Sequence, residues 1–348
     1  MIRAMYSGIS GLKANQTKLD VVGNNIANVG TTAFKNQRIR FQDMLSQNVR
    51  EATGPGRNVG GTNPSQVGLG VQVAGIDTTM TQGNMQPTGG MLDVAIDGEG
   101  FFVVGKGSTS AVIEVPTDGG DTDTDTGTGT GTGDADVESM DTMFTRDGSF
   151  SLDYDGNLIN SDGMRIMGYA TTTGEGNSIS YDDKDGKRTV VFVDSEDEDL
   201  KADPGKLIPL AIPDEITKDD KTLRVKSFSI DKNGLIKAVL SDNTVTAVGQ
   251  IAMASFKNPE GMTKAGKNLW QNSANSGPAV FRTGVGTEAD KANDNGYGDM
   301  VQGMLEMSNV DLSEQFTDMI VASRAFQANG KIITTSDEIL QELVNLKR

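Results

Sequence analysis

Two glycine-containing strings have the spacing of a phosphate-binding loop. Residues 100–106 read Gly-Phe-Phe-Val-Val-Gly-Lys, and residues 261–267 read Gly-Met-Thr-Lys-Ala-Gly-Lys. A nucleotide site needs Ser or Thr after the lysine to hold magnesium. Gly107 and Asn268 stand there instead, and the first string contains an apolar run that is typical of a strand. We therefore interpret both strings as turns beside strands and not as nucleotide sites.

Acidic residues in the middle of the chain suggest two further kinds of chemistry. Residues 125–127 spell the Asp-Thr-Gly triplet of aspartic proteases, but that reaction needs a second, coupled carboxylate in a packed site. The alternate aspartates of 121–125 resemble the start of a calcium loop, yet Thr126 and Thr132 stand where Gly and Glu are required. The acidic run at 194–199 has no ligand spacing either. We interpret all of these acidic residues as parts of solvated segments and not as sites.

The composition removes most other catalytic chemistry. The 348 residues include no cysteine and no histidine. Disulfides, thiolate nucleophiles and zinc–sulfur sites are therefore excluded, and the commonest general base and metal ligand is missing. A serine nucleophile would need a lysine base, and no spacing singles out such a pair. The sequence predicts a protein that is not an enzyme, with no catalytic residues, no cofactor and no metal site.

The charge of the chain limits its partners. The sequence has 31 Lys and Arg against 48 Asp and Glu, a formal net charge of −17. Nucleic-acid binding requires basic surface, so we expect no nucleic-acid partner. No apolar run approaches the ~18 residues of a membrane span, so we expect no membrane insertion. The N-terminus lacks the charged head and apolar stretch of a secretory signal, so an exported protein of this kind would need another route.

Both ends of the chain have the pattern of helices with one apolar side. In residues 1–27 and 312–347, apolar residues recur at alternating intervals of four and three, which is the period of a coiled coil. Asp311 followed by Glu314 predicts a helix start, and Gly30 suits a helix end. Nothing local covers either apolar stripe. We expect the two ends to come together, to pack against other copies of the chain, or both.

These stripes give the predicted assembly contacts. Each member lies on the four-and-three repeat of its own helix and has a large apolar side chain. The predicted contacts are Ile9, Leu12, Leu19, Ile26, Leu312, Phe316, Met319, Phe326, Ile333 and Leu340.

The middle of the chain has the pattern of β structure. Short apolar runs alternate with Asp-Gly and Asn-Gly pairs, which are typical of hairpin turns. The runs lie at 71–73, 92–96, 101–104, 150–152, 189–193, 228–230, 235–240 and 251–256. The turn pairs lie at 97–98, 147–148, 155–156, 162–163, 185–186 and 233–234. The sequence predicts a mainly β protein with α-helical termini, in which nested β domains are inserted between the N- and C-terminal coiled-coil-like helices.

Composition and period also predict the domain boundaries. We expect a terminal helical assembly domain (1–30 and 308–348), an extended linker segment (31–70), a β core domain (71–169 and 248–307) and an inserted outer β domain (170–247). Within the core domain, residues 117–136 consist almost entirely of Thr, Gly and Asp. They have too little apolar surface to offset the entropy of ordering, so we expect a disordered acidic loop there.

Several segments resemble the signatures of bacterial flagellar rod and hook axial proteins. The N-terminal signature is carried by Ser-Gly-Ile-Ser-Gly-Leu at 7–12, Leu-Asp-Val-Val-Gly-Asn-Asn-Ile-Ala-Asn at 19–28 and Gly-Thr-Thr-Ala-Phe-Lys at 30–35. Residues 92–102, 144–150, 156–158 and 168–169 are similar to the core of that family, and residues 308–312, 319–320 and 324–329 to its C-terminal signature. The segments follow one another in the expected order.

Two features make the chain more similar to hook members than to rod members. One is the insertion between Tyr169 and about Val248, and the other is the pair of segments 254–262 and 266–270. The acidic residues 117–136 depart from the usual pattern of the family. Some hook proteins cross-link through a cysteine, which this chain lacks.

The resemblance implies a structural subunit of the flagellar hook. Such a subunit is exported through the flagellar type III apparatus without a cleaved signal peptide and polymerises into a curved extracellular tube. The tube acts as a universal joint that transmits torque from rod to filament, with the terminal helices forming the inner tube and the β domains the outer layers. Implied partners are copies of the chain itself and the rod, hook cap and hook–filament junction proteins. A distal rod subunit of the basal body and a secreted, calcium-assisted β-rich adhesin stay open as alternatives.

Overall fold

The protein is represented by a computed structural model, which describes residues 2–54, 56, 60–108, 113–114, 140–173, 177–181, 187–197, 200–203, 206–218, 221–282 and 298–346. The acidic loop expected at 117–136, with its aspartates, and the turn expected at 185–186 lie outside these residues. The chain folds into two compact units. Unit 1 comprises residues 1–81 and 308–348, and unit 2 comprises residues 82–307.

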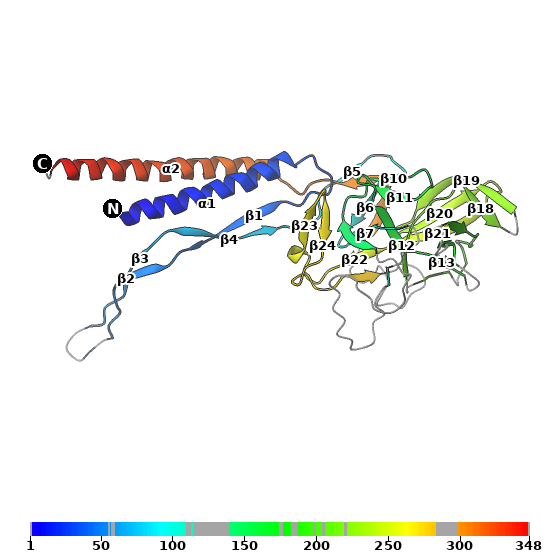
Figure 1. Ribbon diagram of the computed structural model, residues 1–348, viewed down its shortest axis with the longest axis horizontal. Helices are drawn as coiled ribbons and strands as arrows, with labels where there is room; N and C mark the ends of the chain where they lie inside the picture. The colour runs from blue at the N-terminus through cyan, green and yellow to red at the C-terminus, as the bar shows by residue number, and fades with distance from the viewer. Residues whose placement is uncertain are drawn as a thin grey trace. The chain divides into compact units, whose positions relative to one another are not determined.

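Unit 1 contains the two terminal helices. Helix α1 (Ile2–Ala27) and helix α2 (Leu312–Asn345) lie side by side, in blue and red in Figure 1, and run antiparallel. Asp311 caps α2, because its side chain accepts hydrogen bonds from the backbone N–H groups of Ser313 and Glu314. The helices expected from the apolar period are thus confirmed, and the two ends of the chain do come together.

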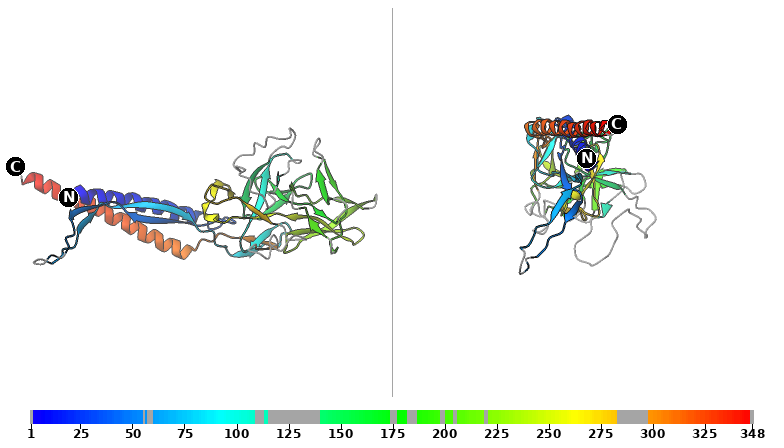
Figure 2. Two further views of the ribbon diagram at one scale, coloured as in Figure 1. Left: turned by 90° about the horizontal axis from the view of Figure 1, so that it is seen from below. Right: turned by 90° about the vertical axis from the view of Figure 1, so that its left-hand side faces the viewer.

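Residues 31–70 form strands, where an extended linker was expected. β1 (Gln37–Asp43) pairs antiparallel with β4 (Val71–Thr78), and β2 (Ser46–Arg50) pairs antiparallel with β3 (Ser65–Gly68). Figure 2 shows the resulting two-stranded ribbon within unit 1.

Unit 2 is built from short antiparallel strands. In chain order they are β5 (Met85–Pro87), β6 (Val94–Asp97), β7 (Phe101–Lys106), β8 (Ile113–Glu114), β9 (Asp141–Thr145), β10 (Phe150–Leu152), β11 (Leu158–Asn160), β12 (Arg165–Tyr169), β13 (Thr171–Thr172), β14 (Ile179–Tyr181), β15 (Arg188–Val190), β16 (Lys201–Ala202), β17 (Lys206–Pro209), β18 (Glu215–Lys218), β19 (Lys221–Ile230), β20 (Leu235–Leu240), β21 (Val245–Ile251), β22 (Met253–Ser255), β23 (Thr263–Gly266), β24 (Leu269–Gln271), β25 (Val280–Arg282), β26 (Asp299–Gln302) and β27 (Met304–Glu306). A short 3-10 helix, Pro259–Gly261, precedes β23. The mainly β fold with helical termini is therefore confirmed.

One continuous sheet organises unit 2. Its main path runs β18-β19-β20-β21-β12-β7-β9-β24-β23. The path joins strands from both the expected β core and the expected outer domain, since Gly168 of β12 pairs with Ile251 of β21. The boundary expected at residue 170 therefore falls inside a hydrogen-bonded sheet, because strand pairing continues across the stretch that the sequence suggested as an insertion.

The turn pairs play two different roles. Asp155-Gly156 connects β10 to β11 and Asn233-Gly234 connects β19 to β20, and both glycines have a φ near the left-handed region, 75° and 76°. These two are hairpins, as expected. Asp147-Gly148 is not, because β9 pairs with β7 and β24 while β10 pairs with β11. Gly148 instead accepts a hydrogen bond from the N–H of Val94 at 3.0 Å, an approach that leaves no room for a Cβ.

The core of unit 2 is apolar and fully enclosed. Phe102 and Phe150 pack edge to face with ring centroids 5.0 Å apart, and Ile166, Leu210 and Ile236 are completely buried in the same cluster. Burying one such side chain stabilises the fold by about 1.5–3 kcal/mol. Unit 2 therefore has its own core, independent of unit 1.

Candidate assembly surface

The two terminal helices contact each other through small and polar side chains. On α2, Gln315, Ala322 and Ser336 are buried at multiples of seven residues, and half-buried Asn329 completes the same line. The buried residues of α1 are Gly8, Gly11, Ala14, Val21, Val22 and Asn25. Small residues let two helix backbones come close together, and polar ones hold them by hydrogen bonds.

Four contacts fix the register of α1 against α2. A Cβ added at Gly8 would lie 3.4 Å from the Ile333 side chain, and one at Gly11 would lie 2.6 Å from Asn329 Nδ2. Further along, Lys18 Nζ forms an ion pair with Asp318 Oδ1 at 3.1 Å. Asn25 Nδ2 donates to Gln315 Oε1 at 3.0 Å. The Lys18–Asp318 pair is partly exposed and contributes at most about 1 kcal/mol.

On α1, the predicted residues Ile9, Leu12, Leu19 and Ile26 lie one residue further along than Gly8, Gly11, Lys18 and Asn25, a rotation of about 100° around the helix. On α2, Met319, Phe326, Ile333 and Leu340 lie four residues after Gln315, Ala322, Asn329 and Ser336, a rotation of only about 40°. The predicted residues therefore lie beside the buried lines, further around the helix on α1 than on α2. Leu12, Leu19, Ile26, Met319, Ile333 and Leu340 are half-buried, whereas Ile9, Leu312, Phe316 and Phe326 are exposed. The structure brings Ile333 against Gly8 of α1, and the role of all ten residues as assembly contacts stays a prediction.

Helix α2 exposes apolar side chains on two opposite sides. Leu312, Phe316 and Ile320 follow at intervals of four and share one side of its first turns. A second set, Val321, Ile332, Ile339 and Leu343, follows at intervals close to whole turns on the other side. We call these sets the first and second flanks of α2. The buried line faces α1 between them, so α1 covers neither flank.

The distribution of exposed apolar side chains separates the two units. Among the residues that the structure describes, 23 large hydrophobic side chains are exposed, and 18 of them belong to unit 1. They include Phe41, Leu45, Val49, Val67 and Ile76 of the ribbon as well as both flanks. The exposed apolar side chains of the described residues are thus concentrated in unit 1.

A network of amides holds the surface together where the helices and the ribbon meet. Besides Gln315, Asn25 contacts both backbone groups of Gln37: its Oδ1 accepts from the N–H at 3.0 Å and its Nδ2 donates to the carbonyl at 2.8 Å. Asn309 Oδ1 accepts from the N–H of Asn36 at 2.7 Å, and its Nδ2 donates to the carbonyl of Thr79 at 2.9 Å. These bonds link the end of α1, the start of α2, and β1 with β4.

Sequence reasoning missed these small and polar residues. Their signal is present in the sequence, since Gly8, Gly11, Lys18 and Asn25 follow one another at helical intervals of three and seven residues. A pattern of large apolar side chains does not include these positions.

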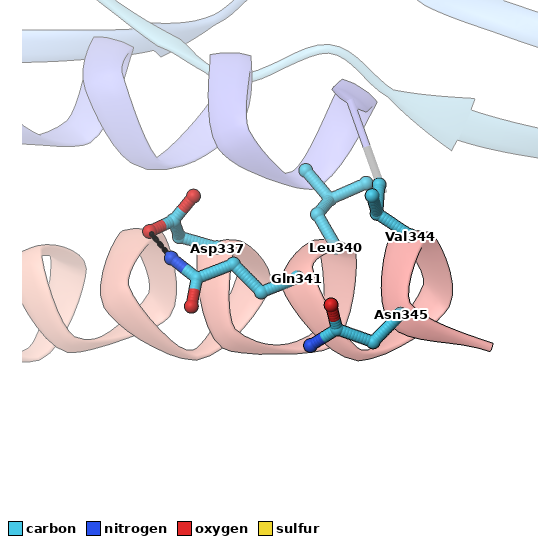
Figure 3. Close-up of a pocket in the computed structure, with 5 residues that line it drawn as sticks. All are labelled: Asp337, Leu340, Gln341, Val344 and Asn345. Carbon is cyan, nitrogen blue, oxygen red and sulfur yellow. Dashed lines mark hydrogen bonds between the residues drawn. The ribbon is translucent and has the colours of Figure 1, made fainter. Parts of the chain in front are cut away.

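A shallow hollow on the last turns of α2 is lined by Asp337, Leu340, Gln341, Val344 and Asn345 (Figure 3). Leu340 and Val344 point to the same side of the helix there, and Gln341 Nε2 donates to Asp337 Oδ2 at 3.1 Å. The hollow is part of the helix surface, and that hydrogen bond joins two of the side chains that line it.

Three side chains of unit 2 have displaced pKa values with ordinary causes. Burial raises the pKa of Tyr181 and lowers the pKa of Lys264, while hydrogen bonds from Thr244 lower the pKa of Asp242. In the described part of the chain no group of three Asp or Glu residues could hold a metal ion. No helix within those residues is long and apolar enough to cross a membrane.

Comparison with known proteins agrees with this geometry. The family model of the flagella basal body rod protein matches residues 5–35, that of the flagellar basal body rod FlgEFG protein C-terminal matches 301–346, and that of the flagellar hook protein FlgE/F/G D1 domain matches 131–238. The flagellar basal-body rod protein FlgG of Bacillus subtilis is 39% identical over 348 residues, with 100% of both chains covered. The chain belongs to the flagellar rod and hook protein family.

Two other flagellar proteins are also similar to this chain. The flagellar hook protein FlgE of Borreliella burgdorferi is 30% identical over 482 aligned residues, with 100% of both chains covered. Among solved structures, the flagellar hook protein FlgE2 of Helicobacter pylori matches with 11% identity and a TM-score of 0.37, covering 64% of this chain and 100% of that chain. The segment matched by the rod protein model, residues 5–35, lies in α1 and the residues after it. The segment matched by the C-terminal model, residues 301–346, contains all of α2. The family models thus cover both helices of the candidate assembly surface.

Proposed function

We propose that the chain is a structural subunit that polymerises through unit 1 into a tubular segment of the flagellar axis. The observation that carries this proposal is the concentration of exposed apolar side chains in unit 1, 18 of 23 among the described residues. Covering such surface is the main driving force for protein association. Unit 2 has a closed core and gains nothing comparable from association.

The two flanks of α2 explain why the product is a polymer and not a dimer. A single partner helix is enough to cover a helix that has one exposed apolar stripe. The first flank (Leu312, Phe316 and Ile320) and the second flank (Val321, Ile332, Ile339 and Leu343) point in different directions. Each copy therefore binds one neighbour on each side, and a contact of this head-to-tail kind repeats until it closes into a ring or continues as a helical tube.

We propose further that this tube is the hook, the curved extracellular joint that transmits torque from rod to filament. The family membership and the similarity to hook proteins over the whole chain support this assignment. In this account the subunit is exported by the type III apparatus, without a cleaved signal peptide. It contacts the rod at one end of the hook, and the hook cap and junction proteins at the other. The chain has no enzymatic role.

The distal rod is the second candidate. The full-length relative from Bacillus subtilis carries the name of a rod protein, at 39% identity and with 100% of both chains aligned. Rod and hook subunits would use the same unit 1 surface, so the contacts of α1 and α2 do not distinguish them.

Electron microscopy of concentrated protein tests polymerisation, and localisation separates hook from rod. Purified protein is expected to form tubes, with or without calcium. Monomers whose stability rises with calcium would instead favour the adhesin alternative. In flagella isolated with their basal bodies, a tagged copy in the curved segment outside the envelope supports the hook. A tagged copy confined to the straight segment inside the envelope would assign the chain to the rod.

A further inference from the structure

The first and last strands of unit 2 form a short neck. The chain enters unit 2 at residue 82 and leaves it at residue 307. Just inside these points, β5 (Met85–Pro87) pairs with β27 (Met304–Glu306) over three residue pairs, and the N–H of Met307 donates to the carbonyl of Asn84 at 2.9 Å. A two-stranded pairing of this length has little stability of its own. Besides backbone bonds such as that from the N–H of Gly303 to the carbonyl of Asp93 at 2.7 Å, a pair of side chains attaches the neck to the rest of the unit.

Glu306 supplies one half of that attachment. Its side chain is completely buried, and both carboxylate oxygens are used. Oε1 accepts from the N–H of Gly83 at 2.8 Å, and Oε2 accepts from Arg146 Nε at 2.9 Å. A single carboxylate therefore joins the entering segment, the leaving segment and the residue that follows β9.

Arg146 supplies the other half. Its side chain is 4% exposed, and Nη2 donates to the carbonyls of Ile96 and Gly98, at 3.2 Å and 2.6 Å. The guanidinium group also lies over the Phe101 ring, 5.8 Å from its centroid. Ile96 is in β6 and Phe101 begins β7, so Arg146 holds the turn between these strands and the neck at the same time.

We propose that the Arg146–Glu306 pair is a mechanical clamp that makes the neck a rigid part of unit 2. Both backbone connections between the units pass through this neck, so any force that enters or leaves unit 2 along the chain acts at the clamp. This role rests on the proposed function, because a flagellar axial subunit carries torque. A packed apolar contact would hold the neck together but would allow it to slide. The charge-assisted hydrogen bonds of Glu306 and those of Arg146 are directional, so together they fix the position of the neck.

The location of the pair in the sequence supports a specific role. Arg146 lies in the segment 144–150 and its partners Ile96 and Gly98 lie in the segment 92–102, two of the segments that resemble the flagellar axial family. The structure shows why these segments belong together: they surround one guanidinium group.

Hydrogen exchange of the full-length monomer provides the first test. In Glu306→Gln, one amide oxygen replaces two carboxylate oxygens, and Arg146 loses its counter-charge in a buried site. The amides of β5 and β27 are expected to exchange about 100-fold faster or more, while the amides of β20 and β21 keep their wild-type rates. Glu215→Gln is the matched control, because the Glu215–Arg224 pair is exposed in the same unit. It should change nothing.

Two outcomes would overturn the clamp. One is an unchanged rate in the neck, and the other is a uniform acceleration throughout unit 2, which would indicate a general contribution to stability. If Glu306→Gln does not fold, Arg146→Lys keeps the charge but loses the two-pronged contact with Ile96 and Gly98. The same comparison of neck and sheet amides then decides the question.

The stiffness of assembled tubes provides the second test. Tubes of Glu306→Gln or Arg146→Lys are expected to form, because unit 1 is intact, but to bend and twist more under thermal motion than wild-type and Glu215→Gln tubes. Equal stiffness would contradict the mechanical role. If wild-type protein forms no tubes at all, the proposed function fails, while the exchange experiment still decides whether the clamp holds the neck.

Discussion

Gly11 of α1 faces Asn329 of α2 so closely that a Cβ on Gly11 would lie 2.6 Å from Asn329 Nδ2. The terminal helices therefore meet at a point where neither contributes a large side chain. Close approach at Gly11 turns the larger residues, such as Leu19 and Phe326, toward the sides of the helix pair. The intrachain contact and the assembly surface are thus two consequences of one arrangement of small and large residues.

Enlarging Gly11 should weaken assembly by forcing the helices apart. Gly11→Leu is expected to raise the critical concentration for polymerisation about tenfold or more, since overpacking a close contact costs about 1–3 kcal/mol. Sedimentation of polymer at a series of protein concentrations measures the change. Gly23→Ala is the matched control, because nothing lies within 4 Å of a Cβ at Gly23. Alanine favours the helix there by about 1 kcal/mol, so this control should polymerise at least as readily as wild type. Equal behaviour of the two variants would contradict the close-contact account.

A carboxylate on the apolar stripes should abolish polymerisation. Leu19→Asp and Phe326→Asp each place a charge at a position that is half-buried or exposed in the subunit and that we propose is covered in the polymer, where burial of an unpaired carboxylate costs several kcal/mol. In the free subunit the same charge reaches water. Circular dichroism and the melting of unit 2 should match wild type, while electron microscopy should show no tubes and cells should not swim.

Thr335→Asp is the control for these two variants. Thr335 is an exposed polar residue that lies between the two flanks of α2, away from the buried line, and its replacement should leave polymerisation unchanged. Hooks of normal length in either stripe variant would show that Leu19 and Phe326 do not make assembly contacts.

The periodicity of the sequence was enough to predict the helices, the β middle and the joining of the two ends. It could not predict which side of each helix would be used within the chain. Apolar spacing reveals a face but not its partner, and here the partner helix takes the neighbouring face, where Gly8 and Asn25 lie. Strand pairing crosses the domain boundary expected at residue 170, because the pairing of Tyr169 with Gln250 joins segments 81 residues apart. The Arg146–Glu306 pair had no local signal, since its members are 160 residues apart.

The uneven charge of the two units predicts salt-dependent assembly. Unit 1 contains 12 of the 31 basic and 10 of the 48 acidic residues, a net charge of +2, which leaves 19 basic and 38 acidic residues and a net charge of −19 for unit 2. Neighbouring copies of unit 2 repel one another at low ionic strength, and salt screens this repulsion over about 8 Å at 0.15 M. The critical concentration should therefore fall as salt rises toward that value.

A variant with fewer charges separates this effect from a general effect of salt on apolar contacts. Asp153, Asp155 and Glu196 are exposed in unit 2. Replacing them with Asn, Asn and Gln should make polymerisation less dependent on salt. If the variant and wild type respond identically, repulsion between copies of unit 2 does not limit assembly.

The central claim is that the flanks of α2 become buried between copies. Hydroxyl-radical footprinting of monomer and polymer measures side-chain exposure directly. The account predicts that Phe316 and Ile320 of the first flank and Val321 and Leu343 of the second lose most of their reactivity in the polymer. Tyr154, which is fully exposed in unit 2, should keep its reactivity. If both flanks stay as reactive in the tubes as in the monomer, the apolar surface of unit 1 does not build the polymer.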